Sequence, residues 1–208
     1  MDRWNKIIAK KLAKVSNNES FQLYQENIND NSKYLLMFKL AGGHYKDQLH
    51  ILSIDLKCDN SKTMDIGQWF PARAPKTKFI TKMFHTNVSP QNGWICLDIL
   101  NSEWSAMYNI DGLIENIVLL LDDPAPSGNH LNGEAAQLQQ SCQKTFNEKS
   151  KKMKQQHGPE FSKLYNECFF EFDKKCSEKY NENKKMIIKC LPYFPRFAKD
   201  IEALKNKN

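Results

Sequence analysis

Chemically versatile side chains gather in one short stretch of this chain, at His85, Asn87, Cys96 and Asp98. A cysteine thiolate accepts an acyl group from another thioester with little change in free energy, and it leaves readily when an amine attacks. Most cysteines, however, are buried structural thiols that take no part in chemistry. Whether Cys96 takes part in acyl transfer or is a structural thiol must therefore be judged from the residues around it.

Several motifs surround Cys96 in a fixed order. In chain order they are Phe70–Phe79 (FPARAPKTKF), Phe84–Asn87 (FHTN), Gly93–Leu100 (GWICLDIL), Trp104-Ser105, Leu119–Pro126 (LLLDDPAP) and Asn132–Ala136 (NGEAA). This series resembles the ubiquitin-conjugating (UBC) family, in which His-Pro-Asn is followed by Ile/Val-Cys-Leu-x-Ile-Leu and then Trp-Ser-Pro. The resemblance spans residues 4 to 155, and the order of the motifs makes it specific.

The resemblance implies roles for three of these residues. Cys96 would receive ubiquitin, or a ubiquitin-like protein, from an activating enzyme as a thioester, and would pass it to a lysine of a substrate protein or to a ubiquitin ligase. Asn87 would donate its side-chain amide to the oxyanion formed during lysine attack, and losing such a donor costs about 10²–10³ in rate. The alternative for Asn87 is to hold the active-site loop. His85 would be a structural residue that bonds nearby backbone rather than a general base.

Some positions depart from the family pattern. Thr86 replaces the proline of His-Pro-Asn, which removes a fixed φ and adds a backbone donor. The turn before Cys96 is one residue longer than in the family, and its Asn-Gly end suits a tight turn. Ala72 replaces an aromatic residue and Ala106 a proline in two loops that contact ubiquitin ligases in the family, and Ser105 lies in the second loop.

The residues that would orient the incoming lysine also differ. Many family members carry Asp or Ser just after the Pro-x-Pro turn, where this chain offers Ser127 and Asn129 but no carboxylate. Asp98 and Asp123 are further candidates for orienting the lysine. Without a base, desolvation and amide contacts would lower the pKa of the attacking amine.

Three other classes of function compete with this interpretation. The first is a UBC-fold protein that binds ubiquitin or a partner without transferring it. Such proteins usually lack the cysteine, which argues against this class, whereas the altered turn and the missing carboxylate argue for it. A cysteine hydrolase needs a general-base histidine oriented by a third group, and no such histidine stands outside the motif. Nucleic-acid binding is disfavoured because no aromatic-basic RNA motif is present.

Hydrophobic periodicity predicts an α+β fold with a four-stranded antiparallel meander flanked by helices. The expected elements are a helix over residues 2–15, strands at Phe21–Gln25, Tyr34–Leu40, Gln48–Leu56 and Lys76–Thr81, a turn at Asn27–Ser32, and helices over 109–123 and 133–153. This order is that of the UBC-like fold, so residues 1–155 are predicted to form the catalytic core. The first helix carries a basic face that would suit the activating enzyme, with Lys6, Lys10, Lys11 and Lys14.

Residues 156–208 are predicted to form a basic, helical C-terminal extension that minimal family members lack. After a break at His157–Pro159, one helix face gathers the large apolar residues Phe161, Leu164, Tyr165, Cys168, Phe169 and Phe172. We expect this face to dock on the core beside the preceding helix, because the break is short. A mobile partner-binding helix is the alternative. From about Ile187 onward we expect a proline-interrupted tail.

Composition sets further limits. The net charge of +6 falls entirely in residues 151–208, where acids and bases are interspersed as on a solvated helix surface. The six cysteines include no Cys-x-x-Cys pair, so we expect no metal site, no disulfide framework and no cofactor. Free thiols, together with the lack of an apolar run of about 18 residues, favour a cytoplasmic or nuclear protein without membrane contact.

Overall fold

The computed structural model describes residues 2–17, 19–57, 69–124, 130–153 and 158–206. Its first half contains α1 (Asp2–Asn17), β1 (Phe21–Asn27), β2 (Asp30–Lys39), the 3-10 turn η1 (Gly43–Tyr45), β3 (Leu49–Asp55) and β4 (Lys76–Phe79). Its second half contains η3 (Asp98–Leu100), α2 (Ile110–Asp122), α3 (Gly133–Ser150), α4 (Pro159–Asn181), α5 (Lys184–Lys189), η4 (Leu191–Tyr193), η5 (Pro195–Phe197) and α6 (Ala198–Lys205). None of the described helices combines the length and apolarity that crossing a bilayer requires.

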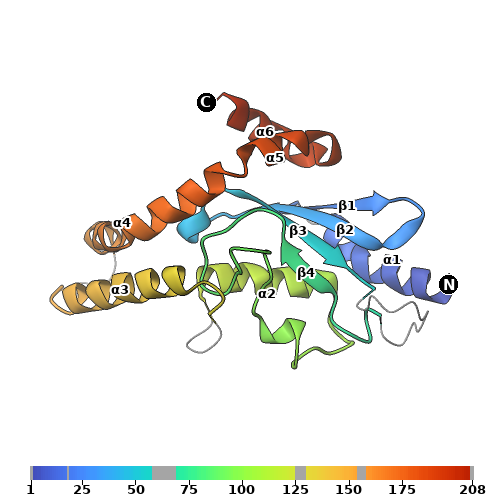
Figure 1. Cartoon of the computed structure of the whole chain (residues 1–208), viewed down its shortest axis with the longest axis horizontal. Helices are drawn as coiled ribbons and strands as arrows, with labels where there is room; N and C mark the ends of the chain where they lie inside the picture. Colours follow the sequence, from blue (N-terminus) through green and yellow to red (C-terminus); the bar gives the residue numbers. More distant parts are fainter. Residues whose placement is uncertain (1, 18, 58–68, 125–129, 154–157, 207–208) are drawn as a thin grey trace.

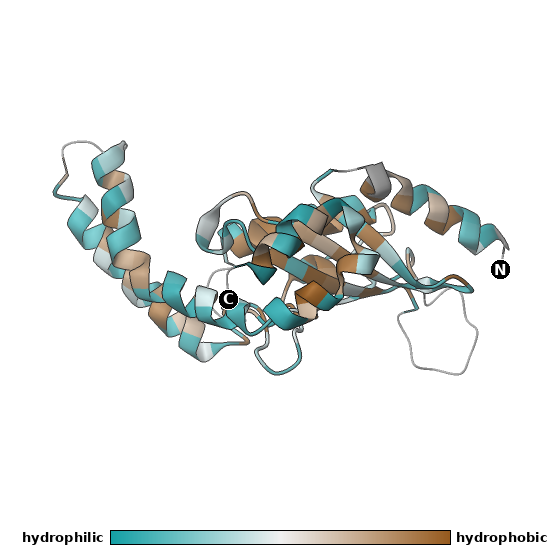
Figure 2. Cartoon of the chain, turned by 90° about the horizontal axis from the view of Figure 1, so that it is seen from above, coloured by the Kyte–Doolittle hydropathy of each residue, from teal (hydrophilic) through white to brown (hydrophobic). Residues whose placement is uncertain are grey.

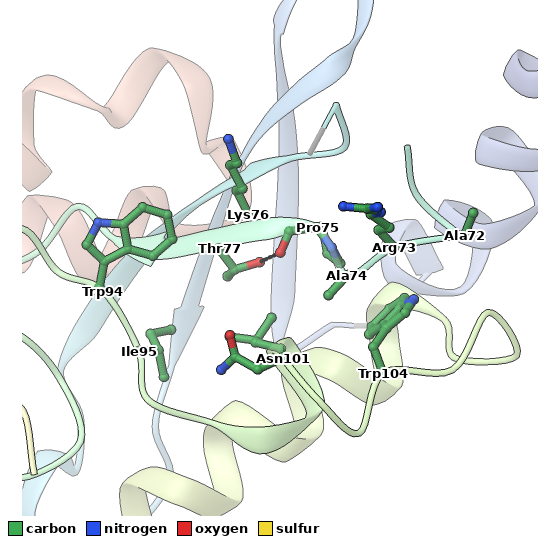
Figure 3. A pocket seen from close by; sticks show the side chains of 11 residues that line it. Ala72, Arg73, Ala74, Pro75, Lys76, Thr77, Trp94, Ile95, Asn101 and Trp104 are labelled. Carbon is green, nitrogen blue, oxygen red and sulfur yellow. Dashed lines mark hydrogen bonds between the residues drawn. The ribbon is translucent and has the colours of Figure 1, made fainter. Parts of the chain in front are cut away.

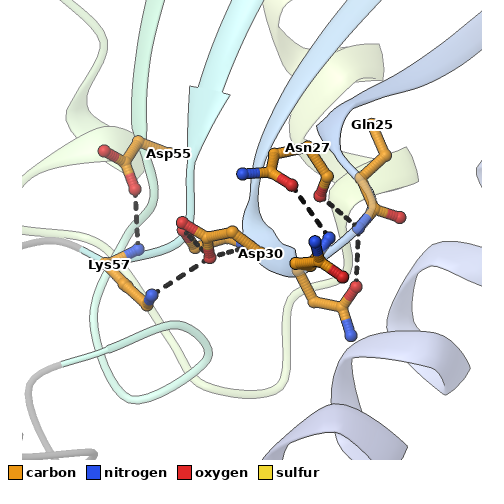
Figure 4. Close-up of polar contacts among 8 residues, drawn as sticks. Gln25, Asn27, Asp30, Asp55 and Lys57 are labelled. Atoms are coloured by element: carbon orange, nitrogen blue, oxygen red, sulfur yellow. Dashed lines mark hydrogen bonds and ion pairs between the residues drawn. The ribbon is translucent and has the colours of Figure 1, made fainter.

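The sheet has the predicted antiparallel order β1-β2-β3-β4, with strand ends that mostly differ from the expected ones by a residue or two. The predicted turn over Asn27–Ser32 was too long, because Asn27 already pairs with Asp30 and β2 begins there. Side-chain bonds hold this polar end of the hairpin in strand form. The Asp30 carboxylate accepts from the Ser32 hydroxyl at 2.6 Å and from the Lys57 ammonium at 3.0 Å (Figure 4).

One face of the sheet packs on α1 and α2 to form the main core (Figure 1). Alternate residues of β2 and β3 point into it, so that Leu36 lies opposite Leu52 across the strand pair. The helices contribute apolar residues at helical spacing, namely Trp4, Ile8 and Leu12 of α1 and Ile110, Leu113, Ile114, Ile117 and Leu121 of α2. The segment that carries Cys96 packs on this core through Val88, Ile95 and Ile99.

The opposite face of the sheet is also covered by helices, although the sequence led us to expect only a proline-interrupted tail in this part of the chain. A second buried cluster joins this face to the last helices, and its members are Met37, Leu49, Ile51, Tyr180, Ile187, Phe194, Phe197, Ile201 and Leu204. We call residues 184–205 the C-terminal cap. The Arg196 guanidinium donates to the carbonyl of Phe21, and Lys39 pairs with Asp200 at 2.8 Å. The prediction of a tail was wrong because β2 and β3 carry apolar side chains on both faces of the sheet. The second face is therefore stable only when other residues shield it from water, and the C-terminal cap does so.

Helix α4 docks on α3 and η1, as the apolar face predicted. Phe146 of α3 meets Phe161 of α4 with ring centroids 5.0 Å apart. His44 of η1 holds the helix at its middle, because its Nδ1 lies 2.6 Å from the Asp173 carboxylate and its Nε2 lies 3.2 Å from the Tyr165 hydroxyl. The α3–α4 pair extends from one end of the molecule (Figure 2).

Candidate active site

Cys96 lies at the end of a short extended segment that is tied to its surroundings by backbone hydrogen bonds. Its N–H donates to the carbonyl of Asn87 at 2.8 Å, and just before it Val88 pairs with Ile95 in an antiparallel bridge. The structure therefore brings Cys96 and Asn87, which are separated by the longer turn, directly together. Asn87 is fully buried, whereas Cys96 is partly exposed.

The longer turn closes on itself. The N–H of Ser89 donates to the carbonyl of Trp94 at 2.8 Å, and the N–H of Gly93 returns to the carbonyl of Ser89 at 3.0 Å. Gly93 has a φ of +73°, and a Cβ added there would lie 2.0 Å from the carbonyl oxygen of Phe79. Glycine at position 93 is thus required by both the backbone conformation and the contact with β4.

His85 has both ring nitrogens engaged by backbone groups. Its Nδ1 accepts from the N–H of Asn87 at 3.0 Å, which leaves Nε2 to donate to the carbonyl of Leu120 at 3.1 Å. Burial lowers the pKa of His85 to about 4, so the ring is neutral at physiological pH. Neither nitrogen is left to take a proton from a substrate, and the ring instead joins the active-site loop to α2.

Thr86 is buried and uses its side chain as a connector. Its hydroxyl donates to the Gln139 side-chain oxygen of α3 at 2.8 Å, and its carbonyl accepts from the N–H groups of Leu131 and Asn132 at 2.9 and 3.1 Å. The sequence indicates only the backbone donor that Thr86 adds and gives no sign of the contact with Gln139. A polar residue on a helix surface gives no local signal of such a contact.

The thiol of Cys96 is held in its protonated form. Burial raises the pKa of the Cys96 thiol, and the nearby carboxylate of Asp98 raises it further because a negative charge opposes the thiolate. Asp98 begins η3 and is exposed to solvent. Among the described candidates for orienting a lysine, Asp98 is the one whose charge acts on the pKa of Cys96.

The other candidates divide into two groups. Asp123 is exposed at the end of α2, where its N–H donates to the carbonyl of Leu119 at 2.8 Å. Ser127 and Asn129 lie outside the described residues. The same holds for Cys58 among the cysteines, while the five described cysteines are free and Cys142 is buried in the α3 face that meets α4.

A groove of about 530 Å³ lies beside the Cys96 segment (Figure 3). Trp94 stands at one end, and Arg73 and Trp104 stand at the other. The described residues that line it are Ala72, Arg73, Ala74, Pro75, Lys76, Thr77, Trp94, Ile95, Leu100, Asn101 and Trp104. The groove is therefore built from residues 72–77, which lead into β4, on one side and from residues both before and after Cys96 on the other.

The family model for ubiquitin-conjugating enzymes matches residues 7–154, which hold the sheet, α2, α3 and the whole Cys96 segment. The chain belongs to the ubiquitin-conjugating enzyme family. The match ends before α4, so α4 and the C-terminal cap lie outside it.

Individual relatives match the chain over different lengths. The chain is 34% identical to ubiquitin-conjugating enzyme E2 1 of Schizosaccharomyces pombe over 139 residues, which are 66% of this chain and 59% of the relative. It is 36% identical to ubiquitin-conjugating enzyme E2 1 of Caenorhabditis elegans over 94 residues, which are 45% of this chain and 48% of the relative. The chain thus spans about half the length of these curated relatives.

A solved structure supports the fold. The E2 domain of a ubiquitin-conjugating enzyme from Toxoplasma gondii superposes with a TM-score of 0.54 at 29% identity. The similarity covers 64% of this chain and 84% of that domain. Together with the four-stranded meander, this confirms the predicted UBC-like fold.

The two loops predicted to contact a ligase in this family lie side by side. The indole N–H of Trp104 donates to the carbonyl of Pro71 at 2.9 Å, which joins the Ala72 loop to the loop of Ser105 and Ala106. The second loop is also held from α1. There the Lys11 ammonium donates to three successive carbonyls, those of Ala106, Met107 and Tyr108, at 3.1, 3.1 and 2.9 Å.

This arrangement gives Lys11 a use that the sequence did not indicate. An ammonium has three donors, and here all three have backbone acceptors in one loop. The loop displays Met107, whose exposed fraction of 86% is high for an apolar side chain. Lys11 therefore fixes the backbone that presents Met107 to solvent.

Proposed function

We propose that this chain is an active ubiquitin-conjugating enzyme that carries ubiquitin, or a ubiquitin-like protein, as a thioester on Cys96. The modifier would come from an activating enzyme and pass to a lysine of a substrate protein or to a ubiquitin ligase. The observation that carries the proposal is the partly exposed Cys96 bonded to the backbone of Asn87 within the family's motif.

Two acyl transfers account for the reaction. In the first, the Cys96 sulfur attacks the thioester carbonyl on the activating enzyme, and that enzyme's thiol leaves with the proton that Cys96 gives up. In the second, a lysine amine attacks the Cys96 thioester, an amide forms, and the Cys96 thiolate leaves and is protonated again. Both steps conserve the acyl group, so neither needs a cofactor or an oxidant.

The raised pKa of Cys96 shapes the first transfer. Because the resting thiol stays protonated, the free chain reacts slowly with other electrophiles, and charging depends on removal of the proton in the complex with the activating enzyme. Partial burial acts in the opposite sense on the incoming lysine, since desolvation lowers the pKa of an amine and favours its nucleophilic form.

Asn87 is the proposed oxyanion donor of the second transfer. Its backbone carbonyl accepts from the N–H of Cys96, so the two residues are neighbours, as an oxyanion donor and the thioester must be. Its complete burial at rest equally suits a residue that holds the loop.

A charging assay tests the proposal. With ubiquitin, ATP and activating enzyme, the chain should form an adduct that thiols cleave, and Cys96→Ser should give an adduct that thiols do not cleave. Cys96→Ala should give none. Cys168→Ala and Cys190→Ala serve as matched controls, because both cysteines are partly exposed and should not affect charging. A full adduct in Cys96→Ala would refute the assignment, and a panel of ubiquitin-like proteins would identify the modifier.

A further inference from the structure

Asn183 joins the end of α4 to the chain just ahead of the active-site motif. It lies between α4 and α5 and is 3% exposed. Its side-chain Oδ1 accepts from the N–H of Lys82 at 2.8 Å, and its Nδ2 donates to the carbonyl of Lys82 at 2.9 Å. One amide thus pairs with both backbone groups of one residue, as a residue of a neighbouring strand would. The same Nδ2 donates to the carbonyl of Lys179 at 3.1 Å, which fixes the amide on the last turn of α4.

Phe84 is a second point at which α4 holds this part of the chain. Its ring lies against that of Phe172 of α4, with centroids 5.5 Å apart. Its carbonyl accepts from the Cys176 thiol of α4 at 3.5 Å and from the Tyr45 hydroxyl of η1 at 2.7 Å. The C-terminal part of the protein therefore contacts the chain at Lys82 and again two residues later.

The same segment continues directly into the residues around Cys96. His85 follows Phe84 and bonds to α2, and Asn87 accepts from the N–H of Cys96. Every residue from 83 to 87 is buried, with 5% exposure at most. Because a closely packed interior leaves no room to absorb a shift, a change in the position of Lys82 is passed along this segment. The place of Lys82 therefore bears on Asn87, five residues further on.

We propose that Asn183 is a positioning residue for transfer from Cys96. It fixes the backbone of Lys82 and, through the buried segment that follows, sets where the Asn87 amide stands relative to the thioester. The inference rests on the proposed function and adds to it a part for the chain beyond residue 154, where the family match ends. Because a displacement of about 1 Å can cost about 10² in rate, loss of this support slows transfer although Asn183 contacts Lys82 rather than the reacting atoms.

The residue before Asn183 provides a matched control. Glu182 also reaches Lys82, but its carboxylate pairs with the side-chain ammonium, at 3.0 Å, rather than with the backbone. Both side chains of this pair are largely exposed, and exposed ion pairs contribute little. Glu182→Ala therefore removes a contact with the same residue while the backbone of Lys82 keeps both of its bonds to Asn183.

Single-turnover discharge of the Cys96 thioester to free lysine measures the effect. We expect Asn183→Ala to charge normally and to discharge about tenfold more slowly, since a misplaced oxyanion donor affects the transition state of lysine attack. Glu182→Ala should discharge at the wild-type rate, and thermal unfolding checks that each variant is folded. Should Asn183→Ala not fold, Asn183→Asp takes its place, because it has the same shape and loses only the donor to the Lys82 carbonyl. Discharge at the wild-type rate in the folded variant would overturn the proposal.

A double-mutant cycle separates positioning from a general loss of stability. If Asn183 acts through Asn87, the change Asn183→Ala slows discharge in the wild-type chain but not in the Asn87→Ala chain, which has no amide left to misplace. A change that only loosens the fold would instead slow both chains by the same factor. Equal factors in the two chains would therefore refute the positioning role.

Hydrogen exchange in the uncharged chain separates this inference from the proposed function. The amides of Asn87 and Cys96 are hydrogen bonded within the active-site segment, at 3.0 and 2.8 Å. By NMR, both should exchange about tenfold faster in Asn183→Ala, while the amide of Leu113 in α2 keeps its rate. If the chain never charges but these two amides respond, the proposed function fails and the support from Asn183 stands. If the chain charges and Asn183→Ala discharges at the wild-type rate, the inference fails alone.

Discussion

The N–H of Cys96 donates to the carbonyl oxygen of Asn87 at 2.8 Å, which makes the two residues neighbours whatever their side chains are. Asn87→Ala should therefore leave the position of Cys96 and its charging intact. We expect discharge of ubiquitin to free lysine to slow by about 10²–10³, because the variant lacks the amide donor for the oxyanion.

The measurement is a single-turnover discharge assay, and thermal unfolding serves as the control for folding. Asn87 would be a structural residue if discharge kept its rate while charging weakened and the melting temperature fell.

The carboxylate of Asp98 lies close enough to Cys96 to raise the pKa of its thiol, after the larger effect of burial. Asp98→Asn removes a negative charge that opposes the thiolate, so the pKa of Cys96 should fall. Alkylation by iodoacetamide at neutral pH should become faster, and the midpoint of its pH profile should move to lower pH. Asp123→Asn is the matched control and should leave the profile unchanged. A midpoint that stays in place or rises in Asp98→Asn would contradict this account.

Lys11 anchors the loop that displays Met107. Lys11→Met keeps most of the hydrocarbon stem but removes the donors to three carbonyls, so the loop should open more often. Hydrogen exchange measured by NMR should speed up at the amide of Tyr108, which donates to the carbonyl of Ser105 in the folded loop. Lys10→Met, at the neighbouring exposed position of α1, should not change it. If the Tyr108 amide exchanged at the same rate in both variants, the loop would be stable without the hydrogen bonds from Lys11.

The C-terminal cap should contribute strongly to stability. Phe194 is fully buried against the sheet face that includes Met37 and Ile51, and Phe194→Ala should lower the free energy of unfolding by about 3–5 kcal/mol. Urea denaturation measures the loss. Tyr193→Ala truncates the preceding aromatic residue, which is 45% exposed, and should cost much less. Similar small losses in both variants would mean that the cap is not an integral part of the fold.

Much of the fold of residues 1–155 could be predicted from local sequence. The helical spacing of Trp4, Ile8 and Leu12 and the period of the strands predicted the elements, because each pattern reports which face of one element avoids water. The motifs around Cys96 identified the family, and the Asn-Gly end of the turn predicted the tight turn that Gly93 makes.

Only the tertiary structure showed which residues, distant in the sequence, contact and stabilise these elements. Lys11 on the loop of Ala106 to Tyr108, Gln139 on Thr86, and the C-terminal cap on the second sheet face all join residues far apart in the chain. No periodicity records such contacts, because a polar side chain on a helix has the same local pattern whether it faces water or a backbone carbonyl. The cap was mistaken for a tail for a related reason. Short, proline-interrupted helices carry little signal of their own, and they are stabilised by the apolar sheet face they cover rather than by their propensity.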